Sequence, residues 1–291
     1  MIVTKIIGGL GNQMFQYAVA RTLASIHNTV LKLDISSYKS YKLRKYELDN
    51  FNINAEIASR EEIDKFTNQP RNPFQKALFA FLPQLQGRSR FYYEEKFYHF
   101  DSEVLNLPNN VYLNGYWQSE KYFIEIQDII RREFTVKHHP DKYNLSLIKQ
   151  INSTDSVGVH IRRGDFVTDE NTKSLHGLYE MDYLQKAIFL MIGKIASIHF
   201  YIFSDDIDWV RNNIKIEYPT TFIDNNIGKK DYEDLMLMSS CKNNIIVNST
   251  FGWWGAWLNK NKSKIVITPK NWYKNGPIDT QDLIPESWIR I

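Results

Sequence analysis

VGVHIRRGD, at residues 157–165, decides how the rest of the chain is interpreted. The β-branched run from Ser156 to Ile161 is typical of a buried parallel strand. Arg162 and Arg163 follow it directly. Each arginine presents five fixed N–H donors and keeps its charge, so a pair at a strand end suits a diphosphate. Taken alone, the same residues could also form an ordinary turn with a surface ion pair.

Strands alternate with helices on both sides of this stretch, which predicts parallel α/β sheets. An apolar strand at 2–7, a helix and a strand at 29–33 form an opening βαβ unit. Later strands are predicted at 111–113, 156–161, 198–203, 220–223, 245–247 and 265–267. Residues 36–110 are irregular and 137–143 form a polar break, so neither segment is assigned to the pattern.

Composition narrows the function classes. The 291 residues are 43% hydrophobic and 24% charged, as in ordinary soluble globular proteins. A net charge of +3 is too small to predict nucleic-acid binding. Cys241 is the one cysteine, which excludes an intrachain disulfide, fits a reducing compartment and favours a small core residue. We expect no signal peptide, and the apolar stretch 187–203 is typical of a helix and a strand, not a membrane span.

GGLGNQM, at residues 8–14, is a glycine-rich turn from a strand into a helix. Such a turn exposes backbone N–H groups at a helix N-terminus and favours anions. It lacks the Lys-Ser/Thr of a Walker loop and the third glycine of the dinucleotide fingerprint. A tight connection is the alternative, although Asn12 adds a side-chain amide that a ligand could reach.

Polar clusters end three strands of the second half of the chain, at 160–165, 204–206 and 248–250. Ligands of open α/β sheets bind beyond the carboxyl ends of the strands, so we expect one shared site. Asp205 and Asp206 could recognise a base or ribose, since guanine presents two donors to a carboxylate. A metal clamp with Asp208 and simple helix N-terminal acids are the alternatives. Two arginines would make a metal redundant, so the clamp is disfavoured.

Residues 248–258, NSTFGWWGAWL, form the third polar strand end and the helix after it. The hydroxyls of Ser249 and Thr250 could cap this helix or hold a phosphate. The tryptophans that follow are expected to pack in the core rather than to form a sugar platform. His160 is either a structural histidine or a nucleotide contact.

Four of these motifs together resemble the bacterial α-1,2-fucosyltransferases of glycosyltransferase family 11. They are GGLGNQMFQYA at 8–18, HIRRGDF at 160–166, FSDD at 203–206 and NSTFGWWGAWL at 248–258. The resemblance implies a GT-B fold, with two Rossmann-like domains facing across a donor cleft. Residues 1–150 would be the acceptor-side domain and 151–291 the GDP-fucose-binding domain.

The implied reaction is inverting transfer of L-fucose from GDP-β-L-fucose to the 2-hydroxyl of a terminal galactoside, in glycan or O-antigen (lipopolysaccharide) synthesis. Relatives of this kind work without a metal, so no cofactor is expected. The resemblance assigns donor binding to Asn12, His160, Arg162, Asp206, Ser249, Thr250 and Phe251, with Arg163 as the neighbouring candidate. Asp205 joins this set of donor-binding residues from the carboxylate argument above.

In catalysis, Arg162 and its neighbours would stabilise the charge that grows on the departing diphosphate. A carboxylate would accept the proton of the acceptor hydroxyl. Asp165 is the first candidate for this base, because it follows the arginines, with Asp169 and Glu170 as alternatives. Glu170 could approach the reacting hydroxyl on a mobile loop.

Two other function classes stay open. One is a transferase that uses another nucleotide sugar, and the other is a non-catalytic glycan-binding protein built on the tryptophans. The arginine pair disfavours the second, because a lectin needs no diphosphate clamp. We expect a galactose-terminated oligosaccharide or a lipid-linked glycan as acceptor, no nucleic acid, and at most peripheral membrane contact, in the cytoplasm or at the inner membrane face.

Overall fold

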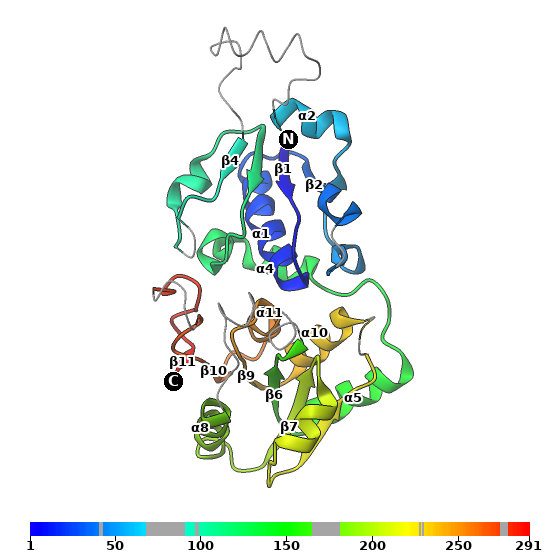
Figure 1. Ribbon diagram of the computed structural model, residues 1–291, viewed down its shortest axis with the longest axis vertical. Helices are drawn as coiled ribbons and strands as arrows, with labels where there is room; N and C mark the ends of the chain where they lie inside the picture. Colours follow the sequence, from blue (N-terminus) through cyan, green and yellow to red (C-terminus); the bar gives the residue numbers. More distant parts are fainter. Residues whose placement is uncertain are drawn as a thin grey trace. The chain divides into compact units, whose positions relative to one another are not determined.

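The computed structural model describes residues 1–40, 43–67, 91–96, 99–164, 181–226, 228, 230–273 and 279–291. The chain divides into two compact units, each with its own sheet (Figure 1). The first comprises Met1–Asp49 with Ile53–Glu133, and the second comprises Asn50–Asn52 with Phe134–Ile291. The main division follows Glu133, ahead of the boundary predicted at residue 150, and the acceptor and donor roles of the two domains remain predictions.

The first unit is built on five parallel strands in the order β3-β2-β1-β5-β4. The strands are β1 (Ile2–Lys5), β2 (Leu31–Asp34), β3 (Glu56–Ile57), β4 (Phe91–Tyr93) and β5 (Val111–Asn114). Its helices are α1 (Leu10–Ile26), α2 (Arg60–Thr67) and α4 (Gln127–Glu133), with 3-10 turns at Ser36–Lys39, Leu48–Asn50, Ser102–Asn106, Glu120–Tyr122 and Ile124–Ile126.

The second unit carries six parallel strands in the order β11-β10-β9-β6-β7-β8. The strands are β6 (Asp155–Ile161), β7 (Ile198–Ser204), β8 (Thr220–Ile223), β9 (Asn243–Ile245), β10 (Val266–Thr268) and β11 (Ile289–Arg290). The helices are α5 (Lys142–Ser153), α8 (Met181–Ile192), α9 (Ile207–Asn213), α10 (Asp231–Ser240) and α11 (Thr250–Leu258). The two parallel sheets with their helices confirm the predicted α/β class.

Each sheet reverses its strand order beside its first strand. In the first unit β1 lies between β2 and β5, and in the second unit β6 lies between β7 and β9. The chain leaves the two strands on either side of such a reversal toward opposite faces of the sheet. A crevice therefore opens between the carboxyl ends of these two strands. The topology therefore marks the ends of β1 with β5, and of β6 with β9, as the places where a ligand can bind.

The core of the second unit explains why its elements form as predicted. Val157, Val159 and Ile161 alternate along β6 and pack with α8 and α9 on one face of the sheet. Trp253, Trp254 and Trp257 of α11 are fully or almost fully buried. This confirms the prediction that they pack in the core and do not form a platform for a sugar. Cys241 is buried too, as predicted, and burial raises the pKa of its thiol. In the described part of the chain, we find no helix with the length and apolar character needed to span a membrane.

Several elements differ from the sequence prediction: β3, α2 and β4 form within the unassigned segment 36–110, β11 was not predicted, and two further differences have local causes. Helix α5 begins within the predicted polar break, where Asp141 caps it by accepting a hydrogen bond from the Asn144 N–H at 2.9 Å. Strand β9 begins two residues before the predicted strand at 245–247. The prediction missed its start because Asn243 and Asn244 are polar residues that are nevertheless buried. The Asn244 amide is satisfied inside the core by Met238 and Asn259.

Candidate functional site

The polar ends of β6 and β9 meet at the point where the second sheet reverses its order. Arg162 directly follows β6, and Ser249 lies between β9 and α11. Arg162 Nη1 donates a hydrogen bond to Ser249 Oγ at 3.3 Å, so the contact spans the crevice between two neighbouring strands. The structure thus brings together two of the clusters that the sequence predicted to share a site.

The third cluster fastens the turn after β6 to the end of β7. Asp205 accepts the backbone N–H of Arg163 on Oδ1 at 2.8 Å and that of Gly164 on Oδ2 at 3.1 Å. A Cβ at Gly164 would lie only 2.7 Å from Asp205 Oδ2, so a side chain there would displace the carboxylate from these hydrogen bonds. Both carboxylate oxygens of Asp205 therefore position the backbone that carries the two arginines.

Arg163 is held by side chains of its own unit. Its Nε lies 3.4 Å from Asp206 Oδ2, and its guanidinium carbon lies 3.4 Å from the centroid of the Trp209 ring. Asp206 Oδ1 also caps α9 by accepting the Trp209 N–H at 3.3 Å. The carboxylate offsets the charge of Arg163 and the ring supports its plane. The two arginines, which the sequence analysis treated alike, therefore differ: the side chain of Arg162 bonds across the switch point, whereas that of Arg163 packs on α9.

Ser249 is the N-cap residue of α11, but its side chain makes no capping hydrogen bond. Its hydroxyl accepts from Arg162 instead. Thr250 and Phe251 open the helix and are partly exposed. The positive end of the α11 dipole therefore lies beside the arginine, which is an arrangement that favours an anion.

His160 is buried at the end of β6, with 6% of its surface exposed. Its ring lies 5.3 Å from that of Phe251, and its Nδ1 has no hydrogen-bond partner among the described residues. Burial, together with the nearby charge of Arg162, lowers the pKa of His160 to about 3. The imidazole is therefore neutral at ordinary pH and can serve as a hydrogen-bonding group without adding charge.

Asn12 occupies the corresponding place in the first unit. It lies in the first turn of α1 after the glycines, and its Oδ1 accepts a hydrogen bond from Gln118 Nε2 at 3.0 Å. Gln118 follows β5, so this contact also joins the two strands at a switch point. Because Oδ1 is engaged, the amide presents its Nδ2 donors, which lie close above Gly8.

The turn that carries Gln118 is constrained. Trp117 adopts a φ of 55°, in the left-handed region that non-glycine residues rarely occupy. Glu94 holds the turn by accepting the N–H groups of Tyr116 at 2.6 Å and Trp117 at 3.0 Å, and burial raises the pKa of this carboxyl. Gln118 Oε1 is buried without a hydrogen-bond partner among the described residues. Strain and an unsatisfied polar atom of this kind concentrate at functional sites.

Trp209, Glu94 and Gln118 were not predicted as site residues from the sequence. A strand ending just before Gln118 was the available signal, because residues 111–113 were predicted as β structure. The predicted bases Asp165, Asp169 and Glu170 lie outside the described residues. Within the described ranges no group of three or more His, Cys, Asp or Glu side chains could hold a metal ion.

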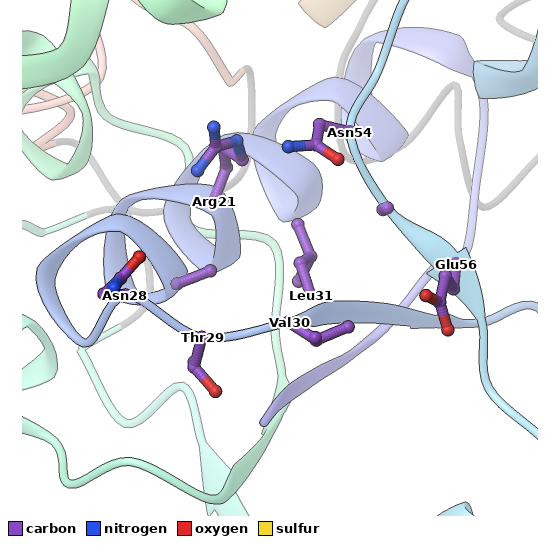
Figure 2. Close-up of a pocket in the computed structure, with 9 residues that line it drawn as sticks. Arg21, Asn28, Thr29, Val30, Leu31, Asn54 and Glu56 are labelled. Atoms are coloured by element: carbon purple, nitrogen blue, oxygen red, sulfur yellow. The ribbon is translucent and has the colours of Figure 1, made fainter.

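A cavity of about 490 Å³ in the first unit is a weaker candidate (Figure 2). It lies at the amino end of β2, between α1 and the segment that leads into β3. Its main cation, Arg21, already pairs with Glu133 at 3.0 Å. Ligands of α/β sheets bind at the opposite, carboxyl edge, so we do not assign this cavity to a substrate.

Comparison with known proteins identifies a family and several relatives. The sequence matches the profile described as "Glycosyl transferase family 11" over residues 1–291. It is 35% identical to an alpha-1,2-colitosyltransferase of Escherichia coli, over 100% of this chain and 99% of that protein. It is 33% identical to the O-antigen biosynthesis glycosyltransferase WbnK of Escherichia coli, over 98% of each chain. A galactoside 2-alpha-L-fucosyltransferase (Sec1) of Mus musculus is 24% identical, over 89% of this chain and 64% of that protein.

The fold is similar to that of a variant of Arabidopsis thaliana FUT1 solved in complex with GDP. The TM-score is 0.54 at 14% identity, covering 99% of this chain and 75% of that chain. At this identity the likeness concerns the fold alone. Together with the two parallel sheets, it confirms the predicted GT-B class.

Gly252 leaves no room for a side chain beneath His160. A Cβ at this position would lie 2.8 Å from His160 Nδ1, so we expect Gly252→Ala to lower the free energy of unfolding by about 1–3 kcal/mol through overpacking. Gly193→Ala is the matched control, because its Cβ would meet nothing closer than 3.7 Å. Urea unfolding checks both variants, and equal stabilities would contradict the tight contact.

Proposed function

The chain belongs to glycosyl transferase family 11, and from that premise we propose that it is a galactoside 2-α-L-fucosyltransferase. It transfers L-fucose from GDP-β-L-fucose to the 2-hydroxyl of a terminal galactoside, with inversion at the anomeric carbon. The family membership confirms the resemblance found in the sequence. The observation that carries the proposal is the Arg162–Ser249 contact at the switch point of the second sheet.

The diphosphate of the donor binds to Arg162, Ser249 and the N-terminus of α11. This assignment is supported by the arginine side chain that reaches across the switch point and by the helix dipole beside it. Arg163 shapes the same turn through its contacts with Asp206 and Trp209. His160 contributes a neutral hydrogen bond to the nucleotide, with Phe251 beside its ring.

The reaction is a single displacement. The acceptor oxygen attacks C1 of fucose, the bond from C1 to the diphosphate oxygen breaks, and GDP departs with the bonding electron pair. Arg162 and the α11 dipole stabilise the negative charge that grows on this leaving group. A carboxylate accepts the hydroxyl proton, and Asp165 and Glu170 are the proposed candidates for it.

Transfer of colitose is the second candidate function. The E. coli colitosyltransferase is 35% identical across the full length of both chains, which favours a related sugar. Colitose is fucose without its 3-hydroxyl. A pocket that hydrogen-bonds this hydroxyl would reject colitose strongly, whereas an apolar pocket would discriminate weakly, so the donor must be measured.

We also propose that the acceptor is a galactose-terminated oligosaccharide, free or linked to a lipid. The support is the name of the O-antigen biosynthesis relative WbnK. A lipid-linked acceptor would place the enzyme peripherally at the inner membrane face, and a free one in the cytoplasm.

A donor panel tests this function. GDP-fucose, GDP-colitose, GDP-mannose and a UDP-sugar are each offered with a galactoside acceptor, with and without EDTA, and the product linkage is determined. We expect GDP-fucose to react fastest, an α-1,2 linkage to galactose, and no loss of rate in EDTA. Preference for GDP-colitose would establish the second candidate, preference for a UDP-sugar would refute both, and loss of rate in EDTA would refute metal independence.

Arg162→Ala should lower kcat by about 1,000-fold, because it removes the charge placed at the leaving group. Its melting temperature should stay close to that of the wild type, since the hydrogen bond from Arg162 to Ser249 is only partly buried. Arg211→Ala is the matched control, because Arg211 forms an exposed ion pair with Asp224 in the same unit. Steady-state kinetics of both variants decide the matter, and full activity of Arg162→Ala would remove this assignment.

Gln118 is proposed as a positioning residue for Asn12. A carboxylate at position 118 can only accept hydrogen bonds. In Gln118→Glu the Asn12 amide must therefore turn its Nδ2 toward residue 118 and present its oxygen, instead of Nδ2, to GDP-fucose. We expect the KM for GDP-fucose to rise about 10- to 100-fold, which corresponds to the loss of a charge-assisted hydrogen bond, with the acceptor KM unchanged. Gln150→Glu, on the exposed face of α5, serves as the control.

A double-mutant cycle separates positioning from a merely structural role. In an Asn12→Ala background, Gln118→Glu should change the donor KM by less than about 2-fold, because the amide that it turns is gone. Additive effects of the two substitutions would show that Gln118 acts independently of Asn12. Gln118→Met, which removes the bond but retains the volume, should fall between the wild type and Gln118→Glu.

A further inference from the structure

A second cavity in the first unit lies at the edge of the sheet where ligands bind. Its volume is about 520 Å³, within the roughly 300–1,000 Å³ typical of small-ligand sites. Lys5, Asp34, Tyr93 and Asn114 line it, and each is the last residue of its strand. Four neighbouring strands therefore end in one cavity, at their carboxyl ends.

The polar groups at the base of this cavity are hydrogen-bonded to one another. Asp34 is 3% exposed, and its Oδ2 accepts a hydrogen bond from the Tyr112 hydroxyl at 2.6 Å. Its Oδ1 accepts the backbone N–H of Ser36 at 2.9 Å. Burial and the neighbouring Asp34 raise the pKa of Tyr112, so its hydroxyl remains a donor. The polar groups at the base are thus held in place before any ligand arrives.

An aromatic ring stands at the mouth of the cavity. Tyr93 is 62% exposed, which is unusual for a large aromatic side chain. Its ring lies 4.5 Å from Phe91, which in turn stacks on Tyr112 at 4.7 Å. The supported Tyr93 ring can pack against the apolar C–H face of a sugar, while Asn114 and the serines beside Asp34 can bond its hydroxyls.

The charges of the cavity select against an anionic ligand. Lys5 is the cation in its lining, and Asp34 and Asp64 are carboxylates, so the described groups sum to a net negative charge. A nucleoside diphosphate would be repelled there. A neutral, hydroxyl-rich ligand matches the mixture of carboxylate, amide, hydroxyl and aromatic groups.

The cavity is tied to the glycine turn that carries Asn12. Tyr38 lies in the same 3-10 turn as Ser36 and Ser37, which line the cavity, and its hydroxyl donates to the Gly8 carbonyl at 2.7 Å. We propose that this cavity binds neutral sugar residues of the acceptor glycan, beyond the galactose that receives the transferred sugar. The inference rests on the proposed function. It implies that longer acceptors bind more tightly, because their additional sugars contact the first unit.

Kinetics with two acceptors test the proposal. The wild type should have a lower KM for a galactose-terminated trisaccharide than for methyl galactoside. Tyr93→Ala should raise the trisaccharide KM by about 3- to 10-fold, the loss expected for one aromatic contact, and leave the KM for methyl galactoside and for GDP-fucose unchanged. Tyr93→Phe keeps the ring and should behave as the wild type.

Tyr143→Ala is the matched control, because Tyr143 is a similarly exposed tyrosine, at 52%, in the second unit. A trisaccharide KM that Tyr93→Ala leaves unchanged, or an equal rise for both acceptors, would overturn the proposal. Saturation-transfer NMR with the trisaccharide alone separates the two levels of inference. If no donor is used but the NMR signal depends on Tyr93, the proposed function fails and the glycan site stands; absence of that signal in the wild type overturns the glycan site.

Discussion

The reversal of strand order beside β6 is the constraint on which the candidate donor site depends. Residues 162 and 249 are far apart in sequence, and they meet only because β6 and β9 are neighbours in a parallel sheet. The helices that follow β6 and β9 cover opposite faces, so nothing in the sheet itself fills the space between their ends. A long, charged side chain can cross that space, and a short hydroxyl at the start of α11 receives it.

Carboxylates in this site organise positive charge. Asp205 spends both oxygens on the backbone of the arginine turn, and Asp206 divides its oxygens between Arg163 and the cap of α9. The charge of Arg163 is therefore offset by Asp206, and its guanidinium stacks on Trp209, so this side chain helps to hold the shape of the turn. Because Arg163 is paired with Asp206, the positive charges facing the switch point, among the described residues, are those of Arg162 and of the N-terminus of α11. These two groups would stabilise an anionic leaving group there.

Most of this architecture could be predicted from local sequence, and the exceptions have physical causes. The strand before the arginines was evident because Val157, Val159 and Ile161 alternate toward a core. Strand β9 was misplaced because Asn243 and Asn244 are buried polar residues, whose hydrogen bonds come from distant segments. The hydrogen bonds of Asp205 to the arginine turn, and the position of Gln118, could not be predicted for the same reason. Each depends on which strands become neighbours, and no local sequence pattern encodes that.

The distribution of charge between the two units has a chemical consequence. In the second unit a cation and a helix dipole sit beside a histidine that burial keeps neutral, so positive potential is concentrated where a diphosphate would bind. In the first unit the corresponding switch point is bridged by two uncharged amides, and the neighbouring cavity carries more carboxylate than cation. The charges of the second unit therefore favour a diphosphate, whereas those of the cavity in the first unit favour a neutral ligand. If the chain has the proposed function, this separation of charge would distinguish the nucleotide from the glycan before any individual hydroxyl is recognised.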